Sequence, residues 1–155
     1  MAAPDLDTLF DFETQIETAI DTVLTTAGLT ATKQRDTSDL ASPFVAVQFV
    51  QGETLGNLYI HTDSVKREDR WNGEIILTIT TQRQKNNSSH ATYRKAIRKE
   101  FANWQNQINA QLTYLILLDC KTMGSTPEIA VDENHDQSVM RYGTPFAIRS
   151  SAWPV

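Results

Sequence analysis

Hydrophobic side chains recur three and four residues apart in two segments of the chain, the pattern of a helix with one buried face. The first segment begins after Asp5, which can cap a helix, and it ends at Gly28, a natural helix stop. The second segment follows Ser88 and Ser89, either of which can cap it. The two predicted stripes are Leu6, Leu9, Phe10, Ile16, Ala19, Ile20, Val23, Leu24 and Ala27, and Tyr93, Ile97, Phe101, Trp104 and Ile108.

Strand patterns occupy most of the remaining chain. Phe44 to Val50 and Glu74 to Arg83 alternate between apolar and polar residues, which is typical of strands with one buried face. Leu112 to Leu118 is continuously apolar and predicts a buried strand, and Val139 to Arg149 predicts the last one. Leu29 to Arg35 can form a further short strand.

Two features bear on how these strands connect. The polar stretch from Gln51 to Arg70 is too long for a tight turn, so we expect an extended hairpin around Leu58 to Ile60 or a mobile loop. Asn72-Gly73 is a turn signal, and Pro145 places the last strand at an edge or at a bulge. The order of elements predicts a single α+β domain over residues 1–155. We expect a mainly antiparallel sheet of four to five strands with two helices packed on one face.

Composition excludes several classes of protein. The chain has 155 residues, a net charge of −5 and one cysteine, Cys120, so an internal disulfide and a cysteine-based zinc site are excluded. No apolar run approaches the ~18 residues of a membrane span, and the N-terminus is acidic where a secretory signal is basic. We expect a soluble, cytosolic domain that is neither a membrane protein nor a generally basic nucleic-acid coat.

Catalytic chemistry finds no support in the sequence. The phosphate-binding, dinucleotide, zinc-protease and nucleophile-elbow motifs are all absent. His61, His90 and His135 fall in separate predicted loops, where we expect solvated side chains, and Cys120 follows a buried strand as a small apolar filler. We therefore expect no enzyme, no cofactor and no metal.

The charges are segregated along the chain. All six charges before Lys33 are negative, whereas six bases and no acid lie between Ile75 and Lys99. The bases can contact phosphates, face the acidic helix within the same chain, or meet the acidic helix of a neighbouring subunit. The acids are Asp5, Asp7, Asp11, Glu13, Glu17 and Asp21, and the bases are Arg83, Lys85, Arg94, Lys95, Arg98 and Lys99.

The three tryptophans divide into two groups. Trp104 lies in the second helical stripe, so we expect it in the core. Trp71 opens a strand beside the long polar stretch, and Trp153 follows the last strand. Aromatic residues at such rims are packed lids or interface anchors, and both interpretations stay open.

Several stretches resemble the tail terminator, or tail-completion, proteins of long-tailed bacteriophages. The resemblance extends over nearly the whole chain and includes no catalytic motif. The stretches are Pro43-Phe44-Val45, Gly73-Glu74 leading to Thr81-x-Arg83, the Asn86 to His90 loop, and the C-terminal run of Tyr142, Phe146-Ala147-Ile148-Arg149 and Ala152-Trp153-Pro154.

The resemblance implies a structural part of the virion, assembled in the host cytoplasm. Such proteins form a six-membered ring that caps the tail tube, stops its growth and meets the head-tail connector, with DNA passing through only as cargo. We expect subunit contacts by Asp11, Glu13, Glu17, Asp21, Arg83, Lys85, Arg94, Lys95, Arg98 and Lys99. We expect axial contacts from the Thr54 to Arg70 loop and its border, through His61, Lys66, Arg67, Asp69, Arg70 and Trp71.

Two alternatives to a ring protein stay open. The basic face of the second helix suits a small nucleic-acid-binding or processing factor, whose binding would fall steeply with salt. A hydrolase with an unrecognised site is the third possibility.

Overall fold

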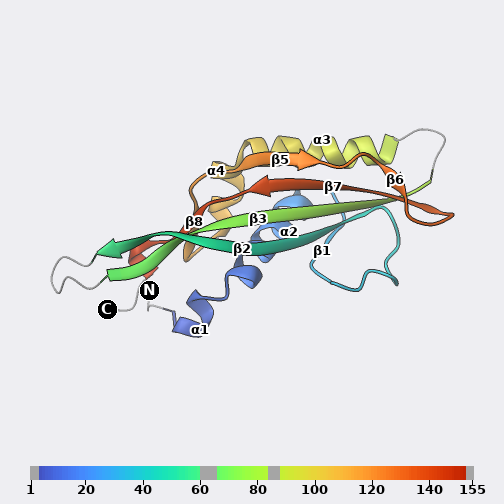
Figure 1. Ribbon diagram of the computed structural model, residues 1–155. Helices are drawn as coiled ribbons and strands as arrows, with labels where there is room; N and C mark the ends of the chain where they lie inside the picture. The colour runs from blue at the N-terminus through green and yellow to red at the C-terminus, as the bar shows by residue number, and fades with distance from the viewer. Residues whose placement is uncertain (1–3, 60–65, 84–87, 153–155) are drawn as a thin grey trace.

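A computed structural model describes residues 4–59, 66–83 and 88–152 of the chain. Within these residues the fold is α+β, with a mixed sheet of eight strands and four α-helices. The predicted class is confirmed, but four to five strands and two helices were too few. In Figure 1 the strands run across the view, with the longer helices α2 and α3 behind and above them.

The predicted first helix is two helices, α1 (Leu6–Leu9) and α2 (Phe12–Thr26). The Asp11 carboxylate accepts a hydrogen bond of 3.3 Å from the Thr14 N–H and so starts a new helix. The side-chain amide of Gln15 donates to three backbone carbonyls around the break, at 3.0–3.2 Å. These bonds satisfy groups that the interrupted helix would leave unpaired.

The longest feature is the antiparallel hairpin of β2 (Phe44–Tyr59) and β3 (Lys66–Gln82). It confirms the hairpin alternative for the polar stretch. The predicted turn at Asn72-Gly73 is wrong, because Gly73 lies inside the ladder opposite Gln51. A Cβ on Gly73 would lie 2.6 Å from the Phe49 ring, so glycine is needed there for close packing.

Short strands complete the other side of the sheet, because the predicted long strands are interrupted. The predicted last strand, Val139 to Arg149, is divided at Pro145, which lacks an N–H. The Pro145 carbonyl accepts a hydrogen bond from the Leu118 N–H at 2.7 Å. The strands are β4 (Leu115–Leu117), β5 (Lys121–Ser125), β6 (Ile129–Ala130), β7 (His135–Gly143) and β8 (Phe146–Ile148).

The strand order is β1-β2-β3-β7-β5, where β1 is Ala31–Thr32. β8 pairs with β3 beyond the end of β7, while β4 pairs with β8 and β6 with β7. Among the described strands only β1 and β2 pair in parallel. The body of the sheet is thus two antiparallel hairpins side by side.

The predicted second helix is also interrupted. α3 (Ser88–Ala102) ends before Asn103, and α4 (Trp104–Gln107) and a 3-10 turn (Asn109–Gln111) follow. A second 3-10 turn, Ser150–Ala152, closes the described chain. Trp104 is partly buried against the core, less than its position in the stripe predicted.

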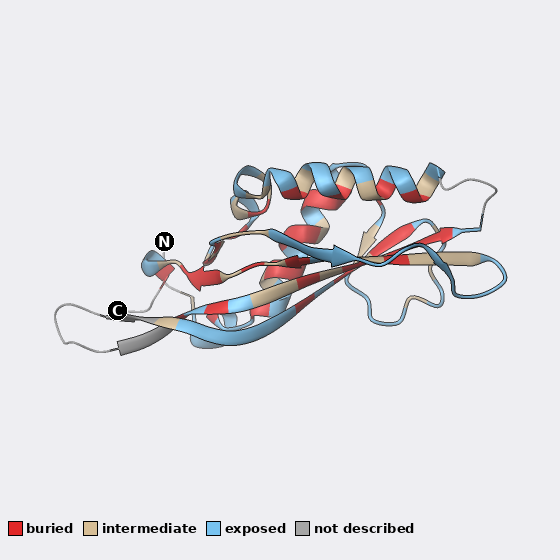
Figure 2. Ribbon diagram, turned by 45° about the horizontal axis from the view of Figure 1, so that its top comes forward, coloured by how far each residue is buried: buried red, intermediate tan, exposed pale blue. Residues whose placement is uncertain are grey.

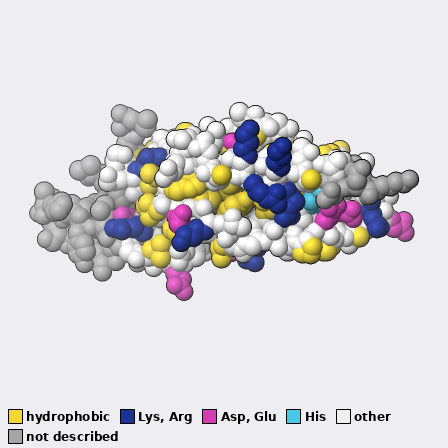
Figure 3. Space-filling model, turned by 90° about the horizontal axis from the view of Figure 1, so that it is seen from above, with side chains coloured by type: hydrophobic (Ala, Val, Ile, Leu, Met, Phe, Trp, Pro, Cys, Tyr) yellow, Lys and Arg dark blue, Asp and Glu magenta, His cyan; other side chains and the backbone are white. Residues whose placement is uncertain are grey.

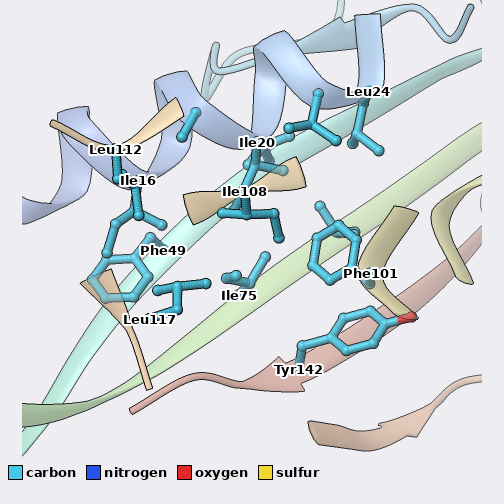
Figure 4. Close-up of a cluster of buried hydrophobic side chains, with 14 of the residues drawn as sticks. Ile16, Ile20, Leu24, Phe49, Ile75, Phe101, Ile108, Leu112, Leu117 and Tyr142 are labelled. Atoms are coloured by element: carbon cyan, nitrogen blue, oxygen red, sulfur yellow. The ribbon is translucent and has the colours of Figure 1, made fainter. Parts of the chain in front are cut away.

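The core lies between the helices and one face of the sheet. Figure 4 shows Ile16, Ile20 and Leu24 of α2 directed toward Phe49 and Ile75 of the sheet, all of them buried. The predicted inward-facing residues of β2 and β3 are confirmed, while β5 and residues 51–55 of β2 are exposed (Figure 2). Because α2 and α3 pack on these strands through their apolar faces, their charged side chains are held at defined positions on the surface.

Candidate subunit interface

Glu17 is buried, with 5% of its surface exposed. Its Oε2 accepts hydrogen bonds of 2.8 Å from Arg35 Nη2 and 2.8 Å from the Phe49 backbone N–H. Arg35 also donates to the Val47 carbonyl at 3.3 Å. The pair thereby caps the outer edge of β2 just past β1. The prediction that Glu17 faces a neighbouring subunit is wrong, because its charge is used inside the chain.

The remaining predicted acids of α2 lie nearer the surface. Asp11 is exposed and caps the N-terminus of α2, and Glu13 in its first turn is exposed. Asp21 is half-buried and accepts a 3.1 Å hydrogen bond from the Thr25 hydroxyl. These three carboxylates are left to form an acidic face.

Three of the predicted bases lie exposed on α3. Lys95, Arg98 and Lys99 are exposed, and none of them joins an ion pair with another described residue. Figure 3 shows Lys and Arg side chains gathered over α3 beside a strip of hydrophobic side chains. We call Lys95, Arg98 and Lys99 the basic face. The predicted contact Lys85 lies outside the described residues.

Two further predicted bases have partners within the chain. Arg94 is half-buried and donates to the hydroxyls of Ser138 at 2.8 Å and Ser125 at 2.9 Å. Arg83 lies 3.6 Å from the Asp136 carboxylate. Arg94 therefore connects α3 to β5 and β7, and its role as a subunit contact stays a prediction.

An intramolecular meeting of the acidic and basic helices is not found. No ion pair between described residues joins an acid of α2 to a base of α3. Both helices nevertheless pack on the same face of the sheet. The two opposite charge groups are thus held on one side of the molecule without neutralising each other directly.

His90 is buried, so the prediction of a solvated histidine is wrong for it. Only 2% of its surface is exposed, Nδ1 lies 3.0 Å from Thr81 Oγ1, and Nε2 lies 2.5 Å from Ser138 Oγ. Burial lowers the pKa of His90, and nearby Arg94 lowers it further against the opposing effect of Glu128. The sequence did hold a signal, because His90 precedes two residues of the helical stripe at helical spacing.

The serine and histidine of this network do not form an open catalytic site. Ser138 is 1% exposed, and its Oγ already accepts a hydrogen bond from Arg94. The nearest carboxylate to His90 Nδ1 is Glu128, at 3.9 Å. A substrate carbonyl has no access to the Ser138 hydroxyl, so the network is suited to holding α3 on β3 and β7.

The predicted axial residues separate into different environments. Trp71 is buried in the core, with its ring 5.6 Å from the Phe146 ring, and Asp69 is 5% exposed, so neither is an exposed contact. Arg70 is exposed, and its Nε lies 3.5 Å from an Asp69 oxygen. His61 and the side chains of Lys66 and Arg67 lie outside the described residues.

Cys120 is partly buried against the core. Burial raises the pKa of its thiol to about 12, and the neighbouring Asp119 carboxylate acts in the same direction. The described residues contain no group of three or more His, Cys, Asp or Glu side chains placed to hold a metal ion. No helix in the described part of the chain is long and apolar enough to cross a membrane.

Comparison with known proteins does not identify the family. A scan against protein-family models and a search of the curated proteins both found no match for this chain.

Proposed function

We propose that this chain is a virion assembly protein of the tail-terminator kind, which forms a homohexameric ring on the end of a phage tail tube. One face of the ring matches the tube end and the other does not, so no further tube subunit can add. The second face meets the head-tail connector, and DNA passes through the ring only as cargo. In this proposal the protein carries out no catalytic reaction.

The proposal rests on the absence of ion pairs between the exposed acids of α2 and the basic face of α3 among the described residues. The basic face and the exposed acids of α2 make no ion pair with each other within the described chain. Contact between them in neighbouring copies is head-to-tail, and such contacts close into rings when the rotation permits. The charges thereby favour self-assembly over a monomer.

The β2–β3 hairpin supports the same proposal. In Figure 1 the two strands run on together beyond α2 and α3. They remain paired from Phe44↔Thr80 to Tyr59↔Lys66, with register shifts after Gln51. A paired arm of this length holds its distal residues at a defined place, as an axial contact with a tube subunit requires.

Native mass spectrometry and negative-stain electron microscopy test the ring directly. We expect a hexamer and ring-shaped particles at concentrations on the order of tens of micromolar. Added to polymerising tail-tube protein from the same genome, the ring should shorten the tubes and remain at one end. A monomer at these concentrations, with no rings and unaltered tubes, would refute the proposal.

Charge variants test how the ring forms. Arg98→Glu with Lys99→Glu should weaken the hexamer most at low salt, because the attraction between exposed charges is screened as salt rises. Arg98→Lys with Lys99→Arg keeps the charge and is the matched control. Equal assembly of both double variants would show that the basic face is not a subunit contact.

A second candidate function uses the same basic face. Lys95, Arg98 and Lys99 are all exposed on one helix, which suits contact with phosphates. A small nucleic-acid-binding factor should bind an oligonucleotide with an affinity that falls steeply between 50 and about 200 mM salt. Tight, salt-sensitive binding by a monomer would favour this function over the ring.

A further inference from the structure

We propose that neighbouring copies of the chain contact each other through Leu55 of β2 in one copy and the groove between α4 and β4 in the next. This inference rests on the proposed ring and names the surfaces that join its subunits. It concerns apolar side chains at the two edges of the sheet, and so differs from the contact between helical charges.

The groove is formed by α4, the 3-10 turn that follows it, and β4. It has a volume of about 520 Å³, and its apolar lining includes Trp104, Ile116 and Leu118. Leu118 is 47% exposed, and Trp104 and Ile116 are half-buried. An exposed apolar groove at the edge of a sheet is a place where another protein surface can bind.

Side chains already bind the backbone of β4 in this groove. The Asn109 side chain accepts a hydrogen bond from the Leu117 N–H at 2.8 Å and donates one to the Leu117 carbonyl at 3.1 Å. Arg149 Nε donates to the Leu115 carbonyl at 3.0 Å. A neighbouring copy therefore meets side chains here, and not a row of unpaired backbone groups.

On the opposite edge of the sheet, β2 is uncovered around Leu55. From Gln51 onward, no strand among the described residues pairs with the outer edge of β2. Leu55 is 50% exposed and lies between Thr54 and Gly56, where the register with β3 shifts. Such a bulge bends the strand and redirects its side chains. Leu55 is thus an exposed apolar side chain on the edge that lies away from β4.

The two surfaces lie at the same level of the sheet. Thr54 pairs with Trp71, and Trp71 pairs in turn with Phe146. Phe146 pairs with Leu117 of β4. One row across the sheet therefore begins beside Leu55 and ends in the part of β4 that lines the groove.

The next row shows which face of the sheet is involved. Gly56 pairs with Arg70, and Arg70 pairs with Ala147. Ala147 pairs with Ile116. Residues directly opposite each other in a sheet share a face, so Ile116 of the groove lies on the same face as Gly56, the residue after Leu55.

The geometry of a ring brings these surfaces together. In the proposed function the β2–β3 hairpin makes the axial contact, so the strands run along the ring axis. Neighbouring copies in a closed ring are related by a rotation that adds no rise. Leu55 of one copy therefore meets the groove of the next copy at its own level.

The helical charges are complementary across the same contact. Glu17 of α2 binds the Phe49 N–H on the outer edge of β2, whereas Arg94 of α3 donates to Ser125 of β5. β4 and β5 both lie on the side of β3 away from β2. A contact between the β2 side of one copy and the β4 side of the next thus also brings the acidic face of α2 toward the basic face of α3.

Opposite charges introduced at the two surfaces test this contact in the full-length protein. Leu55→Lys and Leu118→Glu should each weaken the subunit contact about three- to tenfold, because a half-exposed leucine is no longer buried on assembly. The double variant should regain most of the contact, because the new charges face each other between copies. Sedimentation velocity over a range of protein concentrations measures the contact.

Ile129→Lys is the matched control. Ile129 is 55% exposed but pairs with Gln137 at the other end of the sheet, so this variant should assemble normally. A two-fold contact of β2 with β2 would respond to Leu55→Lys and ignore Leu118→Glu. That result, or equal assembly of all the variants, would overturn the inference.

Disulfide cross-linking identifies the neighbouring residues directly. Leu55→Cys combined with Leu118→Cys, in a Cys120→Ser background, should give a ladder of up to six linked chains on a denaturing gel after copper-catalysed oxidation. Each single-cysteine variant should give no ladder, and neither should Leu55→Cys combined with Ile129→Cys.

The same samples separate this inference from the ring function. If native mass spectrometry shows rings but no ladder forms, the proposed contact is wrong and the ring function stands. A chain that stays monomeric overturns both, whereas cross-linked rings that leave tail tubes unaltered overturn only the function.

Discussion

Glu17 and Arg35 together end the sheet on its β2 side. The Glu17 carboxylate takes the outward N–H of Phe49, and the Arg35 guanidinium binds Glu17 and the Val47 carbonyl. These two side chains therefore bind backbone groups of β2 that a longer β1 would otherwise pair with. An acid that the charge pattern placed on a solvated helix face is thus part of the interior.

Glu17→Ala should lower the free energy of unfolding by about 1–3 kcal/mol, because it leaves the buried Phe49 N–H and part of Arg35 unpaired. Glu13→Ala, on the exposed side of the same helix, is the matched control and should change stability by less than about 0.5 kcal/mol. Urea denaturation with unchanged m-values measures both. Equal effects of the two variants would mean that the Glu17 contacts contribute nothing to stability.

Gly73→Ala should also destabilise the fold, by about 1–3 kcal/mol, because the new Cβ would lie 2.6 Å from the Phe49 ring and 2.9 Å from the Thr144 carbonyl oxygen. Gly56→Ala in the distal hairpin has no atom within 4 Å of its new Cβ and serves as control. Thermal unfolding compares them. Partial rescue by Phe49→Leu would assign the cost to the ring, and a neutral Gly73→Ala would contradict the close packing.

Stability should fall as pH is lowered below 6.5. The pKa of buried His90 is below its ordinary value of 6.5, so the unfolded chain takes up a proton more readily than the folded one. This contribution is complete above pH 6.5 and is lost as pH falls toward the folded-state pKa. Urea midpoints between pH 8 and 5 measure it for the wild type and for His90→Gln. His90→Gln should flatten the curve, and a wild-type curve without slope would contradict the argument.

Cys120 should be inert in the folded protein. Burial raises the pKa of its thiol to about 12, so almost no thiolate exists at pH 8. Alkylation by iodoacetamide should be roughly a hundredfold slower than in the urea-unfolded chain, as followed by mass spectrometry. Cys120 is the single cysteine, so labelling of the Cys120→Ser variant measures the background reaction of iodoacetamide with other groups. Labelling at the unfolded rate would show that the thiol is accessible and ionised.

Local patterns were enough to predict much of the fold. The inward residues of β2 and β3 follow a period of two, and the apolar stripes of α2 and α3 follow the helical period. Pro145, which was expected at an edge or at a bulge of one last strand, lies instead between β7 and β8, because it lacks an N–H. Such features depend on neighbours within a few residues and can be read from the chain directly.

The candidate interface was only partly predictable. Lys95, Arg98 and Lys99 lie on the exposed face expected of them. Trp71 and Glu17 were expected as contacts at the surface but are buried, because residues distant along the chain pack against them. Trp71 packs against Phe146, and Glu17 binds the backbone of a strand 32 residues away. No local pattern contains that information.

The sequence by itself determined the α+β class, the apolar faces and the separation of acids from bases, because periodicity and composition act locally. Only the tertiary structure decided which charges stay free. In the fold, Glu17 and Arg94 form hydrogen bonds with residues of the sheet. His90 is buried between Thr81 and Ser138. The bases of the basic face, Lys95, Arg98 and Lys99, have no ion pair among the described residues. A charged side chain is buried only where distant backbone and side-chain groups satisfy it, so its exposure is a property of the fold.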